Sequence, residues 1–181
     1  RGSGLPILIP SIDLIEIGAG GGSIAHVNDL GLLNVGPESA GAVPGPLCYG
    51  HEGARELTIT DVNLALGRVL PDRFPFPLAR ARVDDELERL AADTGSMPED
   101  VAEGFFRVAN ARMAEALKQV SVQRGYDLRR HALLVFGGAG GQHACALARL
   151  LDVERVVLHP LAGVLSAYGM GLADVRWQED A

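Results

Sequence analysis

Two glycine-rich segments, each directly after a run of strand-forming residues, constrain the fold of this chain more than any other feature. The first covers residues 18–23 and the second residues 137–141. Glycine at the end of a strand lets the backbone approach a ligand closely and adopt positive φ. The exposed amides of such a turn can bind an anion. A tight turn without a ligand is the alternative for each segment, but two of them in one chain favour an anion site.

Neither segment matches a well-known nucleotide motif. The Gly-Lys-Ser/Thr ending of a P-loop is absent, and the second segment lacks the G-x-G-x-x-G spacing of dinucleotide-binding turns. The second segment does precede a predicted helix, whose N-terminal amides favour a phosphate. Spacing alone therefore predicts a nucleotide-like anion site. Its candidate residues are Gly20, Gly21, Gly22, Ser23, Gly137, Gly138, Ala139 and Gly140.

The periodicity of apolar residues predicts an α/β arrangement. Strands are expected at residues 12–17, 24–28, 32–35, 132–136 and 155–158, and the apolar strand at 132–136 is expected to be buried. Helices are expected at residues 62–66, 84–92, 142–151 and 164–172, with a long one from a capping box at 96–99 to near Gly125. The second and third strands form a predicted hairpin. In the last third, strand, turn, helix and strand alternate, which predicts parallel pairing.

Composition narrows the classes of partner and compartment. Hydrophobic residues make up 48% of the 181 residues, enough for a core, and 16 basic against 23 acidic residues give a net charge of −7. That balance disfavours nonspecific binding to nucleic acid or anionic membrane. No stretch approaches the roughly 18 apolar residues of a membrane helix. Cys48 and Cys145 lack metal-type spacing and are expected to be small core residues of a reduced, cytoplasmic protein.

Two carboxylates are candidates for catalysis and for Mg²⁺. Asp13 lies in the strand before the first glycine segment, and Asp61 follows Thr60, a predicted helix N-cap. A carboxylate beside a phosphate loop can hold Mg²⁺ while the phosphates complete the coordination shell. For Asp61, compensation of the helix dipole is the alternative. His143, in the first turn after the second glycine segment, is expected either to pack or to touch a ligand.

Seven segments in a fixed order carry a family resemblance. They are residues 18–25, 35–42, 44–50, 58–64, 120–127, 135–145 and 163–175. Together they resemble the hydantoinase A/5-oxoprolinase family, over nearly the whole chain. Each segment alone is modest, and the fixed order makes the match specific.

The resemblance implies an α/β lobe of the actin/Hsp70/sugar-kinase ATPase type, a mixed sheet flanked by helices, which binds ATP and Mg²⁺. Residues 20–23 look like the second phosphate-binding segment of that fold, and residues 137–140 like its adenosine motif. The first phosphate loop of the family is missing. The resemblance therefore implies that residues 1–181 form a single nucleotide-binding lobe, the C-terminal fragment of a larger subunit, inactive alone.

The family also implies a reaction and partners. Its members phosphorylate a lactam, imide or enolate oxygen, which makes a cyclic amide such as a hydantoin or 5-oxoproline hydrolysable. The implied partners are the cyclic amide substrate, the N-terminal remainder of the same subunit and a hydantoinase B-type subunit or fused domain. Two alternatives stay open: an ATP-dependent ketone carboxylase subunit, and a non-enzymatic actin-like or Hsp70-like nucleotide switch.

Overall fold

The computed structural model describes residues 16–174. Its strands are β1 (Ser23–Val27), β2 (Leu33–Ser39), β3 (Ala132–Val135) and β4 (Arg155–Leu158). Its α-helices are α1 (Ile59–Ala65), α2 (Arg80–Thr94), α3 (Pro98–Gln123), α4 (Gly140–Leu150) and α5 (Leu165–Leu172). Short 3-10 helices lie at Leu47–Tyr49, Pro71–Arg73, Leu128–Arg130 and Ala162–Val164. Of the strand predicted at residues 12–17, residues 12–15 lie outside the described residues, and residues 16 and 17 are not in a strand.

The predicted hairpin is confirmed. β1 pairs antiparallel with β2, with Ala25 opposite Val35 and an irregularity between Ser23 and Ala25. Asn28 closes the turn, because its side-chain oxygen accepts hydrogen bonds from the amides of Leu30 and Leu32, both at 3.0 Å. Local side-chain bonds of this kind make asparagine a strong turn former.

Two predicted helix starts were wrong. Thr58, not Thr60, is the N-cap of α1, and it forms a reciprocal capping box with Asp61. The long helix begins at Pro98 with Met97 as N-cap and no side-chain cap bond. Proline suits a first helical position because its missing N–H would have no partner there.

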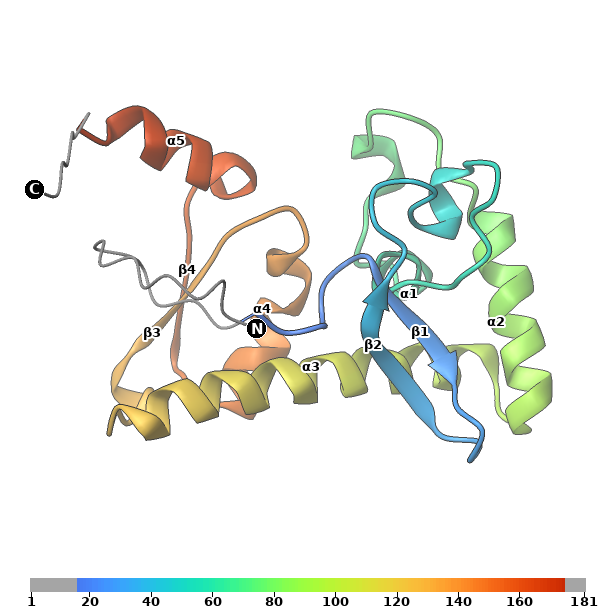
Figure 1. Ribbon diagram of the computed structural model, residues 1–181, viewed down its shortest axis with the longest axis horizontal. Helices are drawn as coiled ribbons and strands as arrows, with labels where there is room; N and C mark the ends of the chain where they lie inside the picture. The colour runs from blue at the N-terminus through green and yellow to red at the C-terminus, as the bar shows by residue number, and fades with distance from the viewer. Residues whose placement is uncertain (1–15, 175–181) are drawn as a thin grey trace, which may run out of the picture.

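The long helix α3 links two hydrophobic cores and runs beneath both halves of the molecule (Figure 1). The larger core packs its first half against the hairpin, α1 and α2, with Phe105 and Ala109 fully buried. The smaller core joins its second half to α4 through Ala114, Leu147 and Leu151. The 26 residues of α3 agree with the predicted long apolar stripe.

The predicted parallel pairing is also confirmed. β3 and β4 are parallel in register from Ala132 opposite Arg155 to Val135 opposite Leu158. Residues 132–136 were expected to be a buried strand, and this is wrong, because Leu134 and Phe136 are each 53% exposed. Within residues 16–174, α4 packs on this two-stranded sheet while Leu134 stays exposed, whereas parallel sheets are usually covered on both faces.

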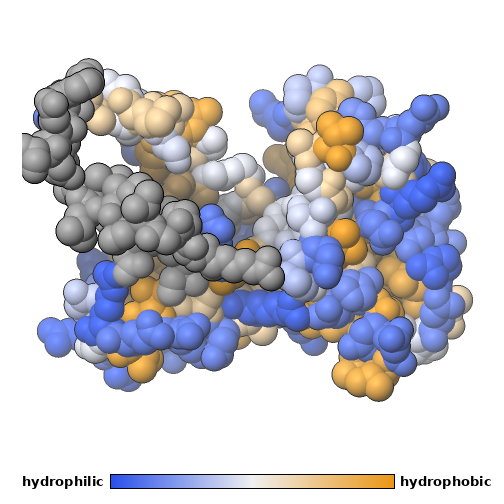
Figure 2. Space-filling model, viewed as in Figure 1, coloured by the Kyte–Doolittle hydropathy of each residue, from blue (hydrophilic) through white to orange (hydrophobic). Residues whose placement is uncertain are grey.

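The surface is mostly hydrophilic over α3, with apolar residues gathered at the hairpin tip and over α5 (Figure 2). At the hairpin tip, Leu30 and Leu32 are 81% and 59% exposed. Among the described residues, none of the helices combines the length and apolar character needed to cross a membrane.

Candidate nucleotide-binding site

The structure brings the two glycine segments together. We call residues 18–23 the first glycine loop and residues 137–141 the second glycine loop. A Cβ built on Gly21 would lie 3.3 Å from the Cβ of Ala139 and 2.9 Å from Oγ1 of Thr60. Thr60 anchors the first loop, since its amide and hydroxyl both donate to the Gly21 carbonyl oxygen, at 2.8 and 2.9 Å. The start of α1 therefore fixes one loop against the other.

The first glycine loop is a closed turn, and two of its amides have no partner in the described part of the chain. The Ser23 hydroxyl accepts from the Gly20 amide at 2.8 Å, and the Ser23 amide donates to the Gly20 carbonyl at 3.0 Å. Ser23 is buried and shapes the turn from inside. Within residues 16–174, the amides of Gly21 and Gly22 have no hydrogen-bond acceptor. These two N–H groups are the donors that a bound anion can use.

The second glycine loop leads into a helix without a cap. Gly137 has φ of +87° and donates to the Ala162 carbonyl at 2.8 Å. Ala139, the N-cap of α4, has no side chain that could accept a hydrogen bond. Within the described part of the chain, the amides of residues 138–141 have no acceptor either. An uncapped helix start is a ready anion site, because its amides and dipole both favour negative charge.

Asp61 is fully buried beneath this site, and its acceptor positions are taken. One carboxylate oxygen accepts from the amides of Leu47 and Thr58 and from the Thr58 hydroxyl, at 3.1, 2.8 and 2.8 Å. The other accepts from the amide of Cys48 at 2.8 Å. A carboxylate has about four acceptor sites, so this geometry favours a structural role for Asp61 over the predicted catalytic and metal-binding role.

A buried polar chain ties three helices together behind the second glycine loop. His143 on α4 is 1% exposed. Its Nε2 lies 3.2 Å from the side-chain nitrogen of Asn63 on α1. Its Nδ1 lies 3.2 Å from Oδ1 of Asn110 on α3. Burial, and then the nearby charge of Arg68, lowers the pKa of His143 from 6.5 to about 4. His143 is therefore a neutral packing and positioning residue, one of the two roles expected for it.

The described residues do not offer a metal centre. Among residues 16–174, no group of three histidine, cysteine, aspartate or glutamate side chains could hold a metal ion. Asp13, the other predicted catalytic and magnesium-binding residue, lies outside the described residues. Its role stays a prediction.

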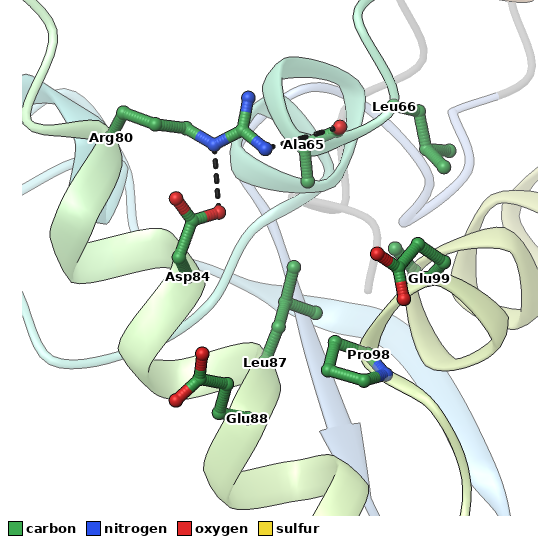
Figure 3. Close-up of a pocket in the computed structure, with 9 residues that line it drawn as sticks. Ala65, Leu66, Arg80, Asp84, Leu87, Glu88, Pro98 and Glu99 are labelled. Carbon is green, nitrogen blue, oxygen red and sulfur yellow. Dashed lines mark hydrogen bonds and ion pairs between the residues drawn. The ribbon is translucent and has the colours of Figure 1, made fainter.

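A pocket of about 330 Å³ lies at the far end of α1, between α2 and the start of α3 (Figure 3). Arg80 closes its upper side: it donates to the carbonyls of Leu64 and Ala65 at 3.2 and 3.4 Å and pairs with Asp84 at 2.7 Å. An arginine at the last carbonyls of a helix is a C-cap. The guanidinium of Arg80 in this pocket is therefore engaged in capping α1.

Comparison with known proteins supports both the fold and the family. A structure of ATP-dependent caprolactamase from Pseudomonas jessenii superposes with a TM-score of 0.78 at 42% identity, covering 88% of this chain and 24% of that one. A nucleotide-free acetone carboxylase superposes with a TM-score of 0.79 at 28% identity, over 88% of this chain and 23% of that one. These structures confirm the predicted fold class: a mixed α/β, actin-like ATPase lobe.

The family follows from the sequence match. The hydantoinase/oxoprolinase model covers residues 2–179, and the chain belongs to that family. A 5-oxoprolinase of Dictyostelium discoideum is 44% identical over 96% of this chain and 15% of its own length. The caprolactamase subunit alpha of Pseudomonas jessenii is 41% identical over 94% of this chain and 25% of its own length. The chain thus spans a quarter or less of the length of these relatives.

Sequence reasoning missed Asn110 and the part that Asn63 plays. Asn110 interrupts the apolar stripe of α3 at a position that is 2% exposed. A polar residue on a buried helix face needs a hydrogen-bond partner. The break in the apolar pattern at Asn110 is therefore the signal that could have identified this residue from the sequence.

Proposed function

We propose that this chain forms the phosphate-binding part of an enzyme that uses ATP to hydrolyse a cyclic amide, such as 5-oxoproline, a hydantoin or a lactam. The observation that carries the proposal is the meeting of the two glycine loops at Gly21 and Ala139, where amides on both sides have no acceptor among residues 16–174.

Each loop suits a different part of the nucleotide. The amides of Gly21 and Gly22 and those of residues 138–141 are donors without acceptors in the described structure. Backbone amides aimed at phosphate oxygens stabilise their negative charge without the reorganisation that long side chains need. At Gly20 and Gly138 an added Cβ would meet nothing within 4 Å, so these two residues leave room for phosphate or ribose to approach the backbone.

ATP supplies the phosphoryl group that activates the amide oxygen, and this chain binds and orients the nucleotide. The amides of the two loops hold the phosphates, and Thr60 holds the first loop in place through the Gly21 carbonyl. The described residues do not fit a magnesium site, since Asp61 is fully hydrogen-bonded. Among the described residues, the backbone donors of the two loops are therefore the groups proposed to bind the phosphates, and the Mg²⁺ role of Asp13 stays a prediction.

The cyclic amide is favoured over a ketone as substrate. The chain is 42% identical to the caprolactamase structure and 28% identical to the acetone carboxylase structure. Caprolactamase carries the name of a subunit alpha, which supports the proposal that a second subunit or a fused domain completes the reaction. The N-terminal remainder of the same subunit is proposed as the other half of the nucleotide cleft.

Nucleotide binding to the intact subunit tests the site. At Gly20 and Gly138 an added Cβ would meet no atom within 4 Å, and neither residue has positive φ. Gly20→Ala and Gly138→Ala should therefore fold normally. Each added methyl would occupy the space proposed for the nucleotide, so ADP affinity measured by calorimetry should fall about tenfold or more.

Gly163→Ala is the matched control, because its Cβ also meets no atom within 4 Å and lies outside both loops. It should bind ADP like the unaltered protein. Unchanged ADP affinity in both Gly20→Ala and Gly138→Ala would remove the two loops from the nucleotide site. A separate assay identifies the substrate class: ATP hydrolysis by the intact subunit should depend on added 5-oxoproline or caprolactam.

A further inference from the structure

A groove of about 450 Å³ runs between α3 and α4, apart from the glycine loops. It lies along the second half of α4, whereas the second glycine loop precedes the first turn of that helix. Its apolar lining comes from Phe106 and Ala111 on α3 and Ala146 and Leu150 on α4. This volume is within the range of small-molecule sites.

The base of the groove is rigid. Phe106 is held between two partners: the Arg68 guanidinium lies 3.8 Å from its ring centroid, and the His143 ring stacks at 5.2 Å and 16°. Asn110 lines the groove as well, and its amide nitrogen donates to the Phe106 carbonyl at 2.7 Å. A site whose walls are already fixed loses little conformational freedom when a ligand binds.

The rim of the groove is basic in an otherwise acidic chain. Arg68, Arg107 and Arg149 line it together with a single carboxylate, Glu103. Glu103 pairs with Arg107 at 3.3 Å; the Arg107 side chain is largely solvated, at 77% exposure, and that of Glu103 partly, at 37%. Neither Arg68 nor Arg149 has a carboxylate partner within residues 16–174. Three arginines and one glutamate leave a local charge of 3 − 1 = +2, against −7 for the whole chain.

We propose that this groove binds a small organic anion: a phosphate or carboxylate attached to an apolar body. The guanidinium groups of Arg68 and Arg149 bind the anionic group, for which their forked donors are suited. The apolar body lies against Phe106, Ala146 and Leu150. The site is separate from the proposed nucleotide site and does not depend on it.

The probe for this site is 1-naphthyl phosphate, and inorganic phosphate and 1-naphthol represent its charged and apolar halves. Each of the three compounds is titrated into the intact protein in a calorimeter. The probe should bind at least about tenfold more tightly than either half, because only the probe uses both the charged rim and the apolar lining. The ring resonances of His143 should shift on binding, since that ring stacks on Phe106 beneath the groove. Excess ADP should leave this binding unchanged.

Three variants locate the probe. Arg68→Gln and Arg149→Gln should each weaken binding about tenfold, the value of a charge-assisted hydrogen bond. Ala111→Phe, at an exposed position that lines the groove, should block it without disturbing the core. Arg89→Gln on α2 is the control and should bind normally.

Three outcomes would overturn the proposal. They are the absence of saturable binding, an affinity unaffected by Arg68→Gln and Arg149→Gln, and displacement by ADP, which would assign the probe to the glycine loops. Binding of inorganic phosphate as tight as that of the probe would likewise overturn the apolar part of the site.

Discussion

His143 and Asn63, 80 residues apart in sequence, are joined by a 3.2 Å contact between the ring Nε2 and the side-chain amide nitrogen. Because that amide nitrogen can only donate, Nε2 accepts and carries no proton. The proton is on Nδ1, which donates to Asn110. With the Asn63 amide in this orientation the contact fits the neutral imidazole, and it connects α1, which holds the first glycine loop, to α4, which follows the second.

The stability of the protein should fall in mild acid because of His143. Its pKa is about 4 in the folded protein, below the ordinary histidine value of 6.5. Between these values the unfolded chain binds the proton more readily than the folded one. The contribution of the neutral His143 to the free energy of unfolding is complete above pH 6.5 and is lost as the pH falls toward 4. It amounts to about 3 kcal/mol of unfolding free energy at most, from a pKa of 6.5 lowered to about 4.

Urea denaturation of the unaltered protein and of His143→Gln at several pH values measures this contribution. Carboxylates titrate in the same range, so the difference between the two proteins is the relevant quantity. His131→Gln, at an exposed position, is the control and should keep the full dependence. Parallel pH curves for the unaltered protein and His143→Gln would contradict the prediction.

Asp61→Asn should destabilise the fold. The amide NH₂ would face backbone amides that now donate to a carboxylate, which leaves buried donors opposed. We expect a loss of about 3 kcal/mol in unfolding free energy. Asp85→Asn, at an exposed position on α2, should change it by less than about 0.5 kcal/mol. A stable Asp61→Asn protein that fails to turn over ATP would instead restore the catalytic role predicted from sequence.

A matched glycine pair tests how tightly the first glycine loop is held. Gly36 and Gly31 both have positive φ, at +59° and +74°. A Cβ on Gly36 would collide with the Gly18 carbonyl oxygen, whereas one on Gly31 would meet no atom within 4 Å. Gly31→Ala should cost about 1 kcal/mol for the left-handed backbone alone.

Gly36→Ala should cost about 3 kcal/mol or more, because backbone must also move. It should weaken ADP binding too, since the displaced Gly18 opens the first glycine loop. Thermal denaturation and calorimetry of the two variants measure both effects. Equal losses of stability in the pair would show that the close approach of Gly36 to Gly18 is not maintained in solution.

The two cysteines should differ in reactivity. Cys48 is fully buried, and burial, followed by the hydrogen bond and charge of Asp61, raises the pKa of its thiol. Cys145 is exposed, which corrects the expectation that both are core residues. Iodoacetamide at pH 8 should modify Cys145 alone in the native protein and both cysteines in urea, as read by mass spectrometry. Cys145→Ser should leave the native protein unmodified; labelling of Cys48 there would contradict its burial.

Elements with a strong local signal could be predicted from the sequence. The hairpin turn at residues 29–31, the parallel strands around α4 and the length of α3 all follow from periodicity and turn chemistry; the closing role of Asn28, which was expected to end the strand, does not. The choice between Thr58 and Thr60 as N-cap did not, since the two residues have similar capping propensity. Thr58 is the N-cap because it is the residue that pairs with Asp61 in the capping box. Two further hydrogen bonds of Asp61 come from residues 47 and 48, which only the folded chain brings close.

The site was predictable in its parts but not in its assembly. Glycine content indicated both loops, yet their meeting at Gly21 and Ala139 depends on the packing of α1 and α4 on α3. The exposure of Leu134 had no local signal either, because an apolar strand has the same pattern whether or not a neighbour covers its second face.

The continuity of α3 has a consequence for the lengths that this segment can tolerate. Its 26 residues form a rod about 39 Å long. The core behind the first glycine loop packs on one end of this rod, and the core behind the second glycine loop packs on the other. One residue inserted between Asn110 and Ala114 would turn one end against the other by about 100° and lengthen the rod by about 1.5 Å. The two loops would then face different directions. Homologous sequences should therefore vary in length at surface turns and hold a constant count of residues along this helix.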